Sequence, residues 1–484
     1  MNGLLGILVA LGLLIFLAYR GVSVLILGPT MALVAIWLSG GLPFLASFTQ
    51  IFMPTLGDFI ILFFPLFLLG AIFGKVMEDS GSAQSIAQGI VAKLGPKQSI
   101  LAVVLCCAVL TYGGVSLFVV AFAMFPVAAS LFRKANIPKR LIPATIALGS
   151  FTFTMTALPG TPSIQNAIPM PFFGTTPFAS PGLGIITGLA MFALGMFWLN
   201  SCANLANAAG EGYGAYTDTL PKPSKSMRES AEGKGFDIME LADPEPQPRN
   251  LPPFALAIAP VILVIAVNLL AVTAILPAMD TDFLSKPLFG STKVEEVGGI
   301  WAVIIALTAS ILFAAVVNWK RFANLKQTVD DGANASVLPI FNTASLVGFG
   351  GVVAALPAFA RVSQYLLGLG DDNPLISLAV SVGVLSGLTG SASGGLSIAL
   401  DTLAEPFIKT AEQTHISLDL MHRVAVVAAG ILDSLPHNGA VITLLAICGL
   451  GHRQAYKDIF VVVILFPLVA LVLLIVLGTL FGSF

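Results

Sequence analysis

Apolar runs long enough to cross a bilayer recur from one end of this 484-residue chain to the other. They cover residues 3–19, 22–40, 56–74, 183–200, 252–275, 298–317, 336–357 and 458–482. About 20 helical residues span the hydrocarbon core of a membrane. Hydrophobic residues make up 57% of the chain and charged residues 10%, whereas soluble proteins carry about 25% charge. The sequence therefore predicts an all-α polytopic membrane protein.

Composition also excludes several classes of partner. The net charge of -2, without a basic cluster, gives no surface for nucleic acid. The first apolar run lacks the basic start and small-residue cleavage site of a signal peptide, so we expect it to be the first membrane helix. The cysteines lie in or beside apolar segments and are expected to pack without disulfides: Cys106, Cys107, Cys202 and Cys448. We expect no metal ion, no cofactor and no enzymatic activity.

Four stretches rich in Gly, Ser, Thr or Pro interrupt apolar segments. They are residues 111–116, 158–162, 388–395 and 435–438. Gly costs roughly 1 kcal/mol relative to Ala inside a helix, so helices are expected to break there. Broken backbone at membrane depth is tolerated only where it is buried in protein or lines a wet cavity. We therefore predict re-entrant hairpins over 98–132 and 374–410, broken helices over 141–162 and 424–447, and a binding site where they meet.

The two halves of the chain repeat each other in order. Leu110-Thr111 recurs as Leu388-Thr389 and Gly70 as Gly348, both 278 residues further on. We predict a first repeat over 1–202, with an amphipathic arm at 75–97, a cytoplasmic linker over 203–250 and a second repeat over 251–484. Each repeat is expected to hold five crossing helices and one hairpin. Because five is odd, the second repeat would be inserted upside down.

The basic residues support this topology. With a cytoplasmic linker, 18 of the 23 Lys and Arg residues fall on cytoplasmic loops, the bias expected of membrane proteins. The remaining five are placed on the other side: Lys286, Lys293, Arg361, Lys409 and Arg423. Both termini are then predicted to face outward.

Inverted repeats with broken elements are typical of secondary transporters. The chain has no Gly-Lys-Ser/Thr phosphate loop for direct ATP drive. A passive facilitator or channel remains open, and it would ignore the proton gradient. An intramembrane serine protease would need Gly-x-Ser-Gly, but Ser391 stands where that motif needs its first Gly.

Three motifs carry a family resemblance over essentially the whole chain. Thr-Tyr-Gly-Gly-Val-Ser at 111–116, Leu-Pro-Gly-Thr-Pro at 158–162 and Gly-Ser-Ala-Ser-Gly-Gly at 390–395 resemble the gluconate permease (GntP) family of the ion-transporter superfamily. The resemblance implies a proton-linked importer of small hydroxy acids in the inner (cytoplasmic) membrane, with a scaffold domain and a moving, elevator-like transport domain. Gluconate-type members have an acidic residue at the first tip and a histidine in the first break. This chain has Tyr112-Gly113-Gly114 and Leu158–Pro162 there, which favours a shorter acid such as 3-hydroxybutyrate over gluconate.

The candidate site follows from missing cations. No Lys or Arg occurs in 98–132, 141–221, 362–408 or 424–452, so backbone N–H groups and helix dipoles are expected to meet the substrate carboxylate. The candidate substrate-binding residues are Thr111, Tyr112, Gly113, Gly114, Ser116, Gly160, Thr161, Thr389, Gly390, Ser391, Ser393, Gly394 and Asn438. Their hydroxyls could instead bond to carbonyls of their own helix.

Few ionisable groups fall inside membrane segments. Asp433 and His437 lie at the second break and are the candidates for proton coupling. Asp58 is expected to cap a helix start at the interface. Sodium remains an alternative coupling ion, since hydroxyls and carbonyls at 389–393 could ligate it. The expected partners are thus a small anionic hydroxy acid, a proton or sodium ion, the lipid bilayer and a second copy in a homodimer.

Overall fold

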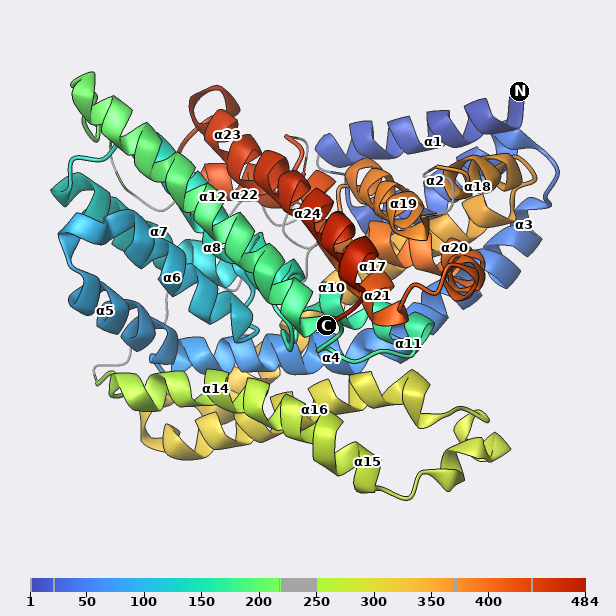
Figure 1. Cartoon of the computed structure of the whole chain (residues 1–484), viewed down its shortest axis with the longest axis horizontal. Helices are drawn as coiled ribbons and strands as arrows, with labels where there is room; N and C mark the ends of the chain where they lie inside the picture. Colours follow the sequence, from blue (N-terminus) through green and yellow to red (C-terminus); the bar gives the residue numbers. More distant parts are fainter. Residues whose placement is uncertain (1, 21, 217, 219–249, 370–372, 437) are drawn as a thin grey trace.

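The computed structural model describes residues 2–20, 22–216, 218, 250–369, 373–436 and 438–484. All regular secondary structure in this part of the chain is helical (Figure 1). The first half contains α1 (Asn2–Tyr19), α2 (Val24–Ser39), α3 (Phe44–Ser47), α4 (Met53–Asp79), α5 (Ser82–Leu94), α6 (Ser99–Tyr112), α7 (Leu117–Lys134), α8 (Ile142–Ser150), α9 (Phe153–Thr156), α10 (Ile164–Ala167), α11 (Pro169–Phe173) and α12 (Pro181–Ala208). The second half contains α14 (Phe254–Leu270), α15 (Leu276–Ala278), α16 (Val294–Val317), α17 (Leu325–Ala355), α18 (Phe359–Leu367), α19 (Pro374–Thr389), α20 (Ala392–Gln413), α21 (Leu418–Leu432), α22 (Gly439–Ile447), α23 (His452–Phe460) and α24 (Phe466–Phe481).

Six helices of the described residues are long and apolar enough to cross a membrane. They cover Phe44–Asp79, Pro181–Ala208, Phe254–Ala278, Val294–Val317, Leu325–Ala355 and His452–Phe481. Shorter apolar helices add Gly3–Ala18, Val24–Ser39, Ser99–Tyr112 and Pro374–Thr389. The predicted all-α membrane class is confirmed, whereas the number of crossings and the inverted insertion stay predictions.

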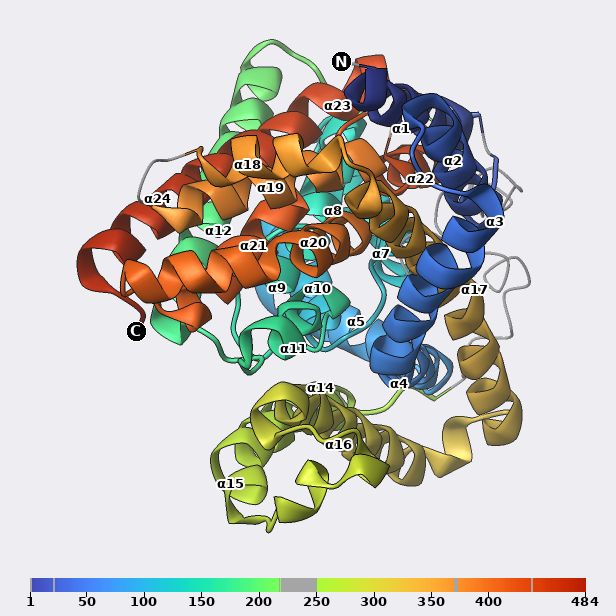
Figure 2. The ribbon, with the colours of Figure 1, turned by 90° about the vertical axis from the view of Figure 1, so that its right-hand side faces the viewer.

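Two long helices from different halves, α4 and α17, pack along each other. A Cβ on Gly332 near the start of α17 would lie 2.8 Å from Ile72 Cα, and one on Gly348 would lie 2.9 Å from Phe52 O. Later residues of one helix therefore meet earlier residues of the other, and the pair is antiparallel. α2 packs against α17 and α16 against α4, so each half flanks the other half's long helix (Figure 2).

Each half contains a helical hairpin at its predicted tip. α6 turns back into α7 through residues 113–116, and Gly114 there has a φ of +97° that favours glycine. α19 turns back into α20 at Gly390 and Ser391, where the Ser391 hydroxyl caps α20 by accepting a hydrogen bond from Gly394 N. The two hairpins lie on opposite sides of the middle of the molecule (Figure 1).

The first broken helix is shorter than the sequence predicts. Its regular part was expected to run to residue 157, but α8 ends at Ser150 and only the single turn of α9 follows. Hydroxyls explain the difference: Thr152 donates to Leu148 O at 2.6 Å and Thr154 to Gly149 O at 2.8 Å. Such bonds compete with the helix's own hydrogen bonds and favour irregular backbone.

Two further expectations need correction. Asp58 does not cap a helix start, because the helix is continuous from Phe44 to Asp79 and places this residue in its interior. The linker also begins later than residue 203, because α12 continues to Ala208.

The residues that follow α12 fold onto the basic turn between α7 and α8. The side chain of Lys139 is buried and pairs with Asp218 at 3.1 Å, and Arg140 pairs with Glu211 at 2.9 Å. Described residues of the predicted linker therefore pack against this basic turn.

Candidate transport site

One small cavity collects residues from both hairpins and both broken helices. Its lining residues are Leu117 of α7, Phe151, Met155, Thr156 and Gln165 of the first broken segment, Ala392 of α20, and Gly430, Asp433 and Ser434 of the second. The space open to the centre of a water molecule is about 10 Å³, roughly enough for one water. The four interrupted elements thus converge on one point.

The second break is organised by Asn438. Its Nδ2 donates to Asp433 Oδ1 at 2.7 Å and to Gly390 O at 2.6 Å, while its Oδ1 accepts from Ala440 N at 2.7 Å. One side chain therefore caps α22, holds the cavity acid and ties the break to the tip of the second hairpin. The other coupling candidate, His437, lies outside the described residues.

At the first break the hydrogen bond runs the other way, with the hairpin tip as donor and the break as acceptor. Tyr112 at the tip donates its hydroxyl to Pro159 O at 2.6 Å. A Cβ on Gly114 would lie 3.1 Å from Pro162 Cγ, so tip and break are in close contact. On the far side, Asn268 of α14 donates to Gly160 O at 3.3 Å.

A buried arginine lies close to the cavity, although the sequence predicts no cation there. Arg423 was assigned to a loop beyond the uncharged segment 424–452, but α21 begins at Leu418 and carries Arg423 into the interior, where none of its surface is exposed. Its Nε and Nη2 donate to Ala179 O at 3.1 and 2.8 Å, and Nη1 donates to Thr156 O at 3.2 Å.

Neighbouring polar side chains complete this contact. Arg423 Nη1 also donates to Asn166 Oδ1 at 3.2 Å, and Nη2 reaches Pro177 O at 3.5 Å. His422 Nε2 bonds the same Asn166 Oδ1 at 3.2 Å, and its Nδ1 shares a 2.6 Å hydrogen bond with Thr175 Oγ1. α21 therefore fixes the whole first broken segment from Thr156 to Ala179.

The predicted hydroxyls have mixed roles. Thr389 donates to Leu385 O at 2.8 Å and Thr161 Oγ1 accepts from Ser163 N at 3.4 Å, so both serve local backbone. Ser391 and Ser393 lie 3.3 Å apart at the start of α20, next to the cavity residue Ala392. In the described part of the chain, Thr111 Oγ1 is buried without a hydrogen-bond partner.

Of the sequence candidates that the structure describes, Asp433 alone lines the cavity directly. Ser116, Ser391 and Ser393 adjoin lining residues, and Asn438 holds Asp433. Sequence reasoning missed Thr156, Gln165 and Ser434 in the wall. It also missed Arg423, which contacts residues of the cavity wall from the other side. The position of this arginine directly before the uncharged segment 424–452 could have indicated that it is buried.

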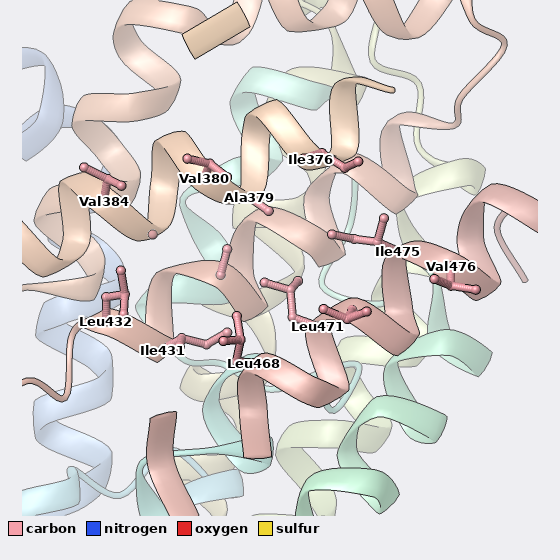
Figure 3. A pocket seen from close by; sticks show the side chains of 13 residues that line it. Ile376, Ala379, Val380, Val384, Ile431, Leu432, Leu468, Leu471, Ile475 and Val476 are labelled. Atoms are coloured by element: carbon pink, nitrogen blue, oxygen red, sulfur yellow. The ribbon is translucent and has the colours of Figure 1, made fainter. Parts of the chain in front are cut away.

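A larger groove elsewhere has the wrong chemistry for a hydrophilic solute. It lies between α19, α21 and α24 and has a volume of about 530 Å³ (Figure 3). Its lining is aliphatic throughout, including Val380, Leu432, Leu471 and Ile475. A carboxylate placed there would lose its hydration without gaining a hydrogen bond, which excludes the groove as the solute site.

A membrane protein whose interrupted helices converge on a small cavity with polar side chains in its wall has the architecture of a transporter. This chain belongs to the GntP permease family, since the model of that family, described as "GntP family permease", matches residues 3–480. It is 47% identical over 465 residues to the "Uncharacterized transporter YxjC" of Bacillus subtilis (strain 168), covering 95% of both chains. The predicted family is confirmed, while the 3-hydroxybutyrate branch stays a prediction.

Two solved transporters have the same fold. The structure of Neisseria gonorrhoeae MtrF, described with a class of antimetabolite efflux pumps, matches with a TM-score of 0.51 at 13% identity, over 86% of this chain and 80% of that one. The Alcanivorax borkumensis YdaH transporter, described as having an unusual topology, matches with a TM-score of 0.51 at 16% identity, over 88% and 87%.

Proposed function

We propose that this permease is a proton-coupled symporter of a small hydroxy monocarboxylate, such as 3-hydroxybutyrate, in the inner membrane. The observation that carries the proposal is the position of Asp433, an acid on the wall of the cavity where both hairpins and both breaks meet. An ionisable group inside a membrane protein is a functional candidate because leaving it there is costly.

The cavity wall favours a short amphipathic acid. Thr156, Gln165 and Ser434 offer hydrogen-bonding groups, whereas Phe151 and Met155 are apolar. A short hydroxy acid has a carboxylate, one hydroxyl and an alkyl segment, which match both kinds of surface. A sugar acid such as gluconate carries hydroxyls along its whole length and would leave several of them against the apolar wall.

Electrostatics gives a reason for proton coupling. Two unit charges 4 Å apart repel by about 4 kcal/mol at an effective dielectric constant of about 20. An ionised Asp433 would therefore oppose a carboxylate in the same cavity, and protonation removes the repulsion. Proton and anion then bind together and leave together, as symport requires.

Transport needs the site to open to each side of the membrane in turn. We infer that the hairpins and broken helices move as one transport body against α2, α4, α16 and α17. The contacts of α21 with the first break support this, because Arg423 and Gly430 both hold that segment: a Cβ on Gly430 would lie 2.7 Å from Thr156 Cγ2. The inverted insertion of the two halves belongs to the same proposal.

The decisive experiment is uptake into proteoliposomes of labelled 3-hydroxybutyrate, gluconate and lactate under imposed proton or sodium gradients. We expect 3-hydroxybutyrate to accumulate when the outside is acidic, without a requirement for sodium. Accumulation driven by sodium alone would replace the proton, and uptake indifferent to both gradients would identify a facilitator. Preference for gluconate would reject the short-acid assignment.

Asp433→Asn tests the coupling role directly. The neutral side chain keeps the shape and the contact with Asn438, so exchange of internal for external substrate should persist while pH-driven accumulation is lost. The matched control is Glu405→Gln, an acid-to-amide change at an exposed residue of α20 that pairs with Lys409. Accumulation by Asp433→Asn would remove this residue as the proton carrier.

Topology can be tested with single cysteines in a Cys-free background. Ala209, just after α12, and Asp282, between α15 and α16, are both exposed. Membrane-impermeant reagents should label Ala209→Cys and Asp282→Cys from opposite sides. Labelling from the same side would reject the inverted topology.

A further inference from the structure

Arg423 is fully buried, and oxygen atoms of the first break surround its guanidinium. Its five hydrogen bonds reach Thr156 O, Asn166 Oδ1, Pro177 O and, twice, Ala179 O. A guanidinium has five N–H donors in a fixed plane, so all of them can be satisfied here. Lysine could not reproduce this pattern, because its ammonium is a point charge with three donors.

The charge of Arg423 is not neutralised by a direct ion pair. Within the described residues no carboxylate oxygen lies within ion-pair distance of it. Asp419, one turn earlier on α21, interacts with the charge of Arg423 without direct contact. Arginine stays protonated in proteins, and a buried charge without a counter-ion is costly. A full positive charge therefore remains inside the protein, held by carbonyl and amide dipoles.

This charge lies directly behind the cavity wall. Thr156, whose carbonyl accepts from Nη1, lines the cavity, and so does Gln165, the residue before Asn166. Asp433 also lines the cavity, ten residues further along the chain from Arg423 and thus about 15 Å away along α21. The guanidinium has no free donor for a solute, so it acts through the wall and its potential.

We propose that Arg423 is a positioning and specificity-determining residue of the transport site: it fixes the irregular shape of the first break and gives the cavity a positive potential that selects a monoanion over a neutral or cationic solute. The proposal rests on the proposed function only in taking this cavity as the route of the solute. It makes Arg423, a residue of the second half of the chain, responsible for the preference of the site for a negatively charged substrate.

The potential can be measured without knowing the substrate. Gln165→Cys is placed in the cavity wall of a protein whose four native cysteines are alanine and whose Asp433 is asparagine. The rates of modification by anionic sulfonatoethyl and cationic trimethylammonioethyl methanethiosulfonate are then compared, each relative to a free thiol. We expect the anionic reagent to react preferentially, and Arg423→Gln to reduce that preference roughly tenfold.

Two variants separate charge from shape. Arg423→Lys keeps the charge and loses the planar donors, so it should keep the anionic preference while slowing uptake. Asn166→Asp keeps the side-chain shape and places a carboxylate beside Arg423, so it should lower the preference as Arg423→Gln does. Arg361→Gln, at an exposed arginine of α18, is the control that should leave the preference unchanged.

The outcomes distinguish this proposal from the proposed function. Equal reaction of both reagents in the parent protein overturns the role of Arg423, even if Arg423→Gln fails to fold. An unchanged preference in folded Arg423→Gln and Asn166→Asp overturns it as well. A clear anionic preference that depends on Arg423 supports it, even if 3-hydroxybutyrate proves not to be transported.

Discussion

The first and second broken helices hold irregular backbone in the protein interior by different means. The first has a cation, Arg423, brought from the other half of the chain to satisfy its carbonyls. The second is held within its own half, by Asn438 bonding Asp433 and Gly390 and by His452 and Tyr456 of α23 bonding Pro436 O and Ser434 O. The first break therefore depends on packing against the other half of the chain, whereas the second depends on its own half.

The two hairpin tips differ in the same sense. In the first half the tip donates, through the Tyr112 hydroxyl to Pro159 O. In the second half the tip accepts, at Gly390 O from Asn438. Elements that correspond in order along the chain thus have opposite hydrogen-bond directions, which shows that matching positions in the two halves need not share a role.

The largest expected effect is at the second hairpin. A Cβ on Gly395 would lie 2.2 Å from both Cα and N of Ser386, which are backbone atoms that cannot move aside. Gly395→Ala should therefore separate α19 from α20 and abolish uptake, with a loss of stability of about 3 kcal/mol or more. Thermal unfolding followed by size-exclusion chromatography measures it.

The corresponding change at the first tip should be milder. Gly114→Ala brings a Cβ to 3.1 Å from a proline ring atom and strains a backbone of φ +97°, at a cost of roughly 1–2 kcal/mol. Gly70→Ala is the control, since a Cβ there meets nothing within 4 Å. Equal losses at Gly395 and Gly114 would contradict the difference between the tips.

The hydrogen bonds that tie each tip to its break should also differ in strength. Asn438→Ala removes two donated bonds and the α22 cap, and should cost about 2–4 kcal/mol, whereas Tyr112→Phe removes one bond and should cost about 1 kcal/mol. Asn373→Ala, which removes a comparable cap from α19, is the matched control at about 1 kcal/mol. Tyr112→Phe costing more than Asn438→Ala would reverse the comparison.

The hydrogen bond between His422 and Thr175 is a weaker contact of α21 with the first broken segment than those of Arg423. Thr175→Val removes the 2.6 Å hydrogen bond to His422 Nδ1 and should cost about 1–2 kcal/mol, because the ring nitrogen stays buried without a partner. Thr187→Val removes only a bond to its own helix, at Leu183 O, and serves as control. Comparable melting temperatures for the two variants would mean that His422 does not depend on Thr175.

The smallest effect is expected from pH, away from both breaks. Burial raises the pKa of the Asp218 carboxyl, but hydrogen bonds from Tyr213 and Lys139 and the charges of Lys139 and Arg133 outweigh it, so the pKa lies below its usual value. Stability from this group is therefore present above the carboxyl's unfolded pKa and is lost as pH falls through its folded pKa. Asp218→Asn should therefore slightly reduce the fall in melting temperature as the pH is lowered. An unchanged dependence of melting temperature on pH would exclude Asp218 as its source.

The first interruption begins earlier than predicted, after Ser150. The sequence was sufficient for the class, the family, both hairpin tips and the second break. Those features depend on local properties: hydropathy, Gly and Pro content, and motifs such as 390–395. It was insufficient for the contacts of α21 with the first break, because the second broken helix was predicted to begin at residue 424, whereas α21 begins at Leu418 and carries His422 and Arg423 into the interior. The cavity residues Thr156 and Gln165 were missed because their hydropathy is ordinary and only the fold places them together.

The origin of Arg423 in the second half has a consequence for biosynthesis. Thr156 and Arg423 are 267 positions apart, so a ribosome adding roughly 5–20 residues per second needs roughly 13–53 s to make the second after the first. During that interval the carbonyls of the nascent first break have no guanidinium to accept from. The first broken segment therefore cannot reach its final conformation until α21 has been synthesised and has packed against it.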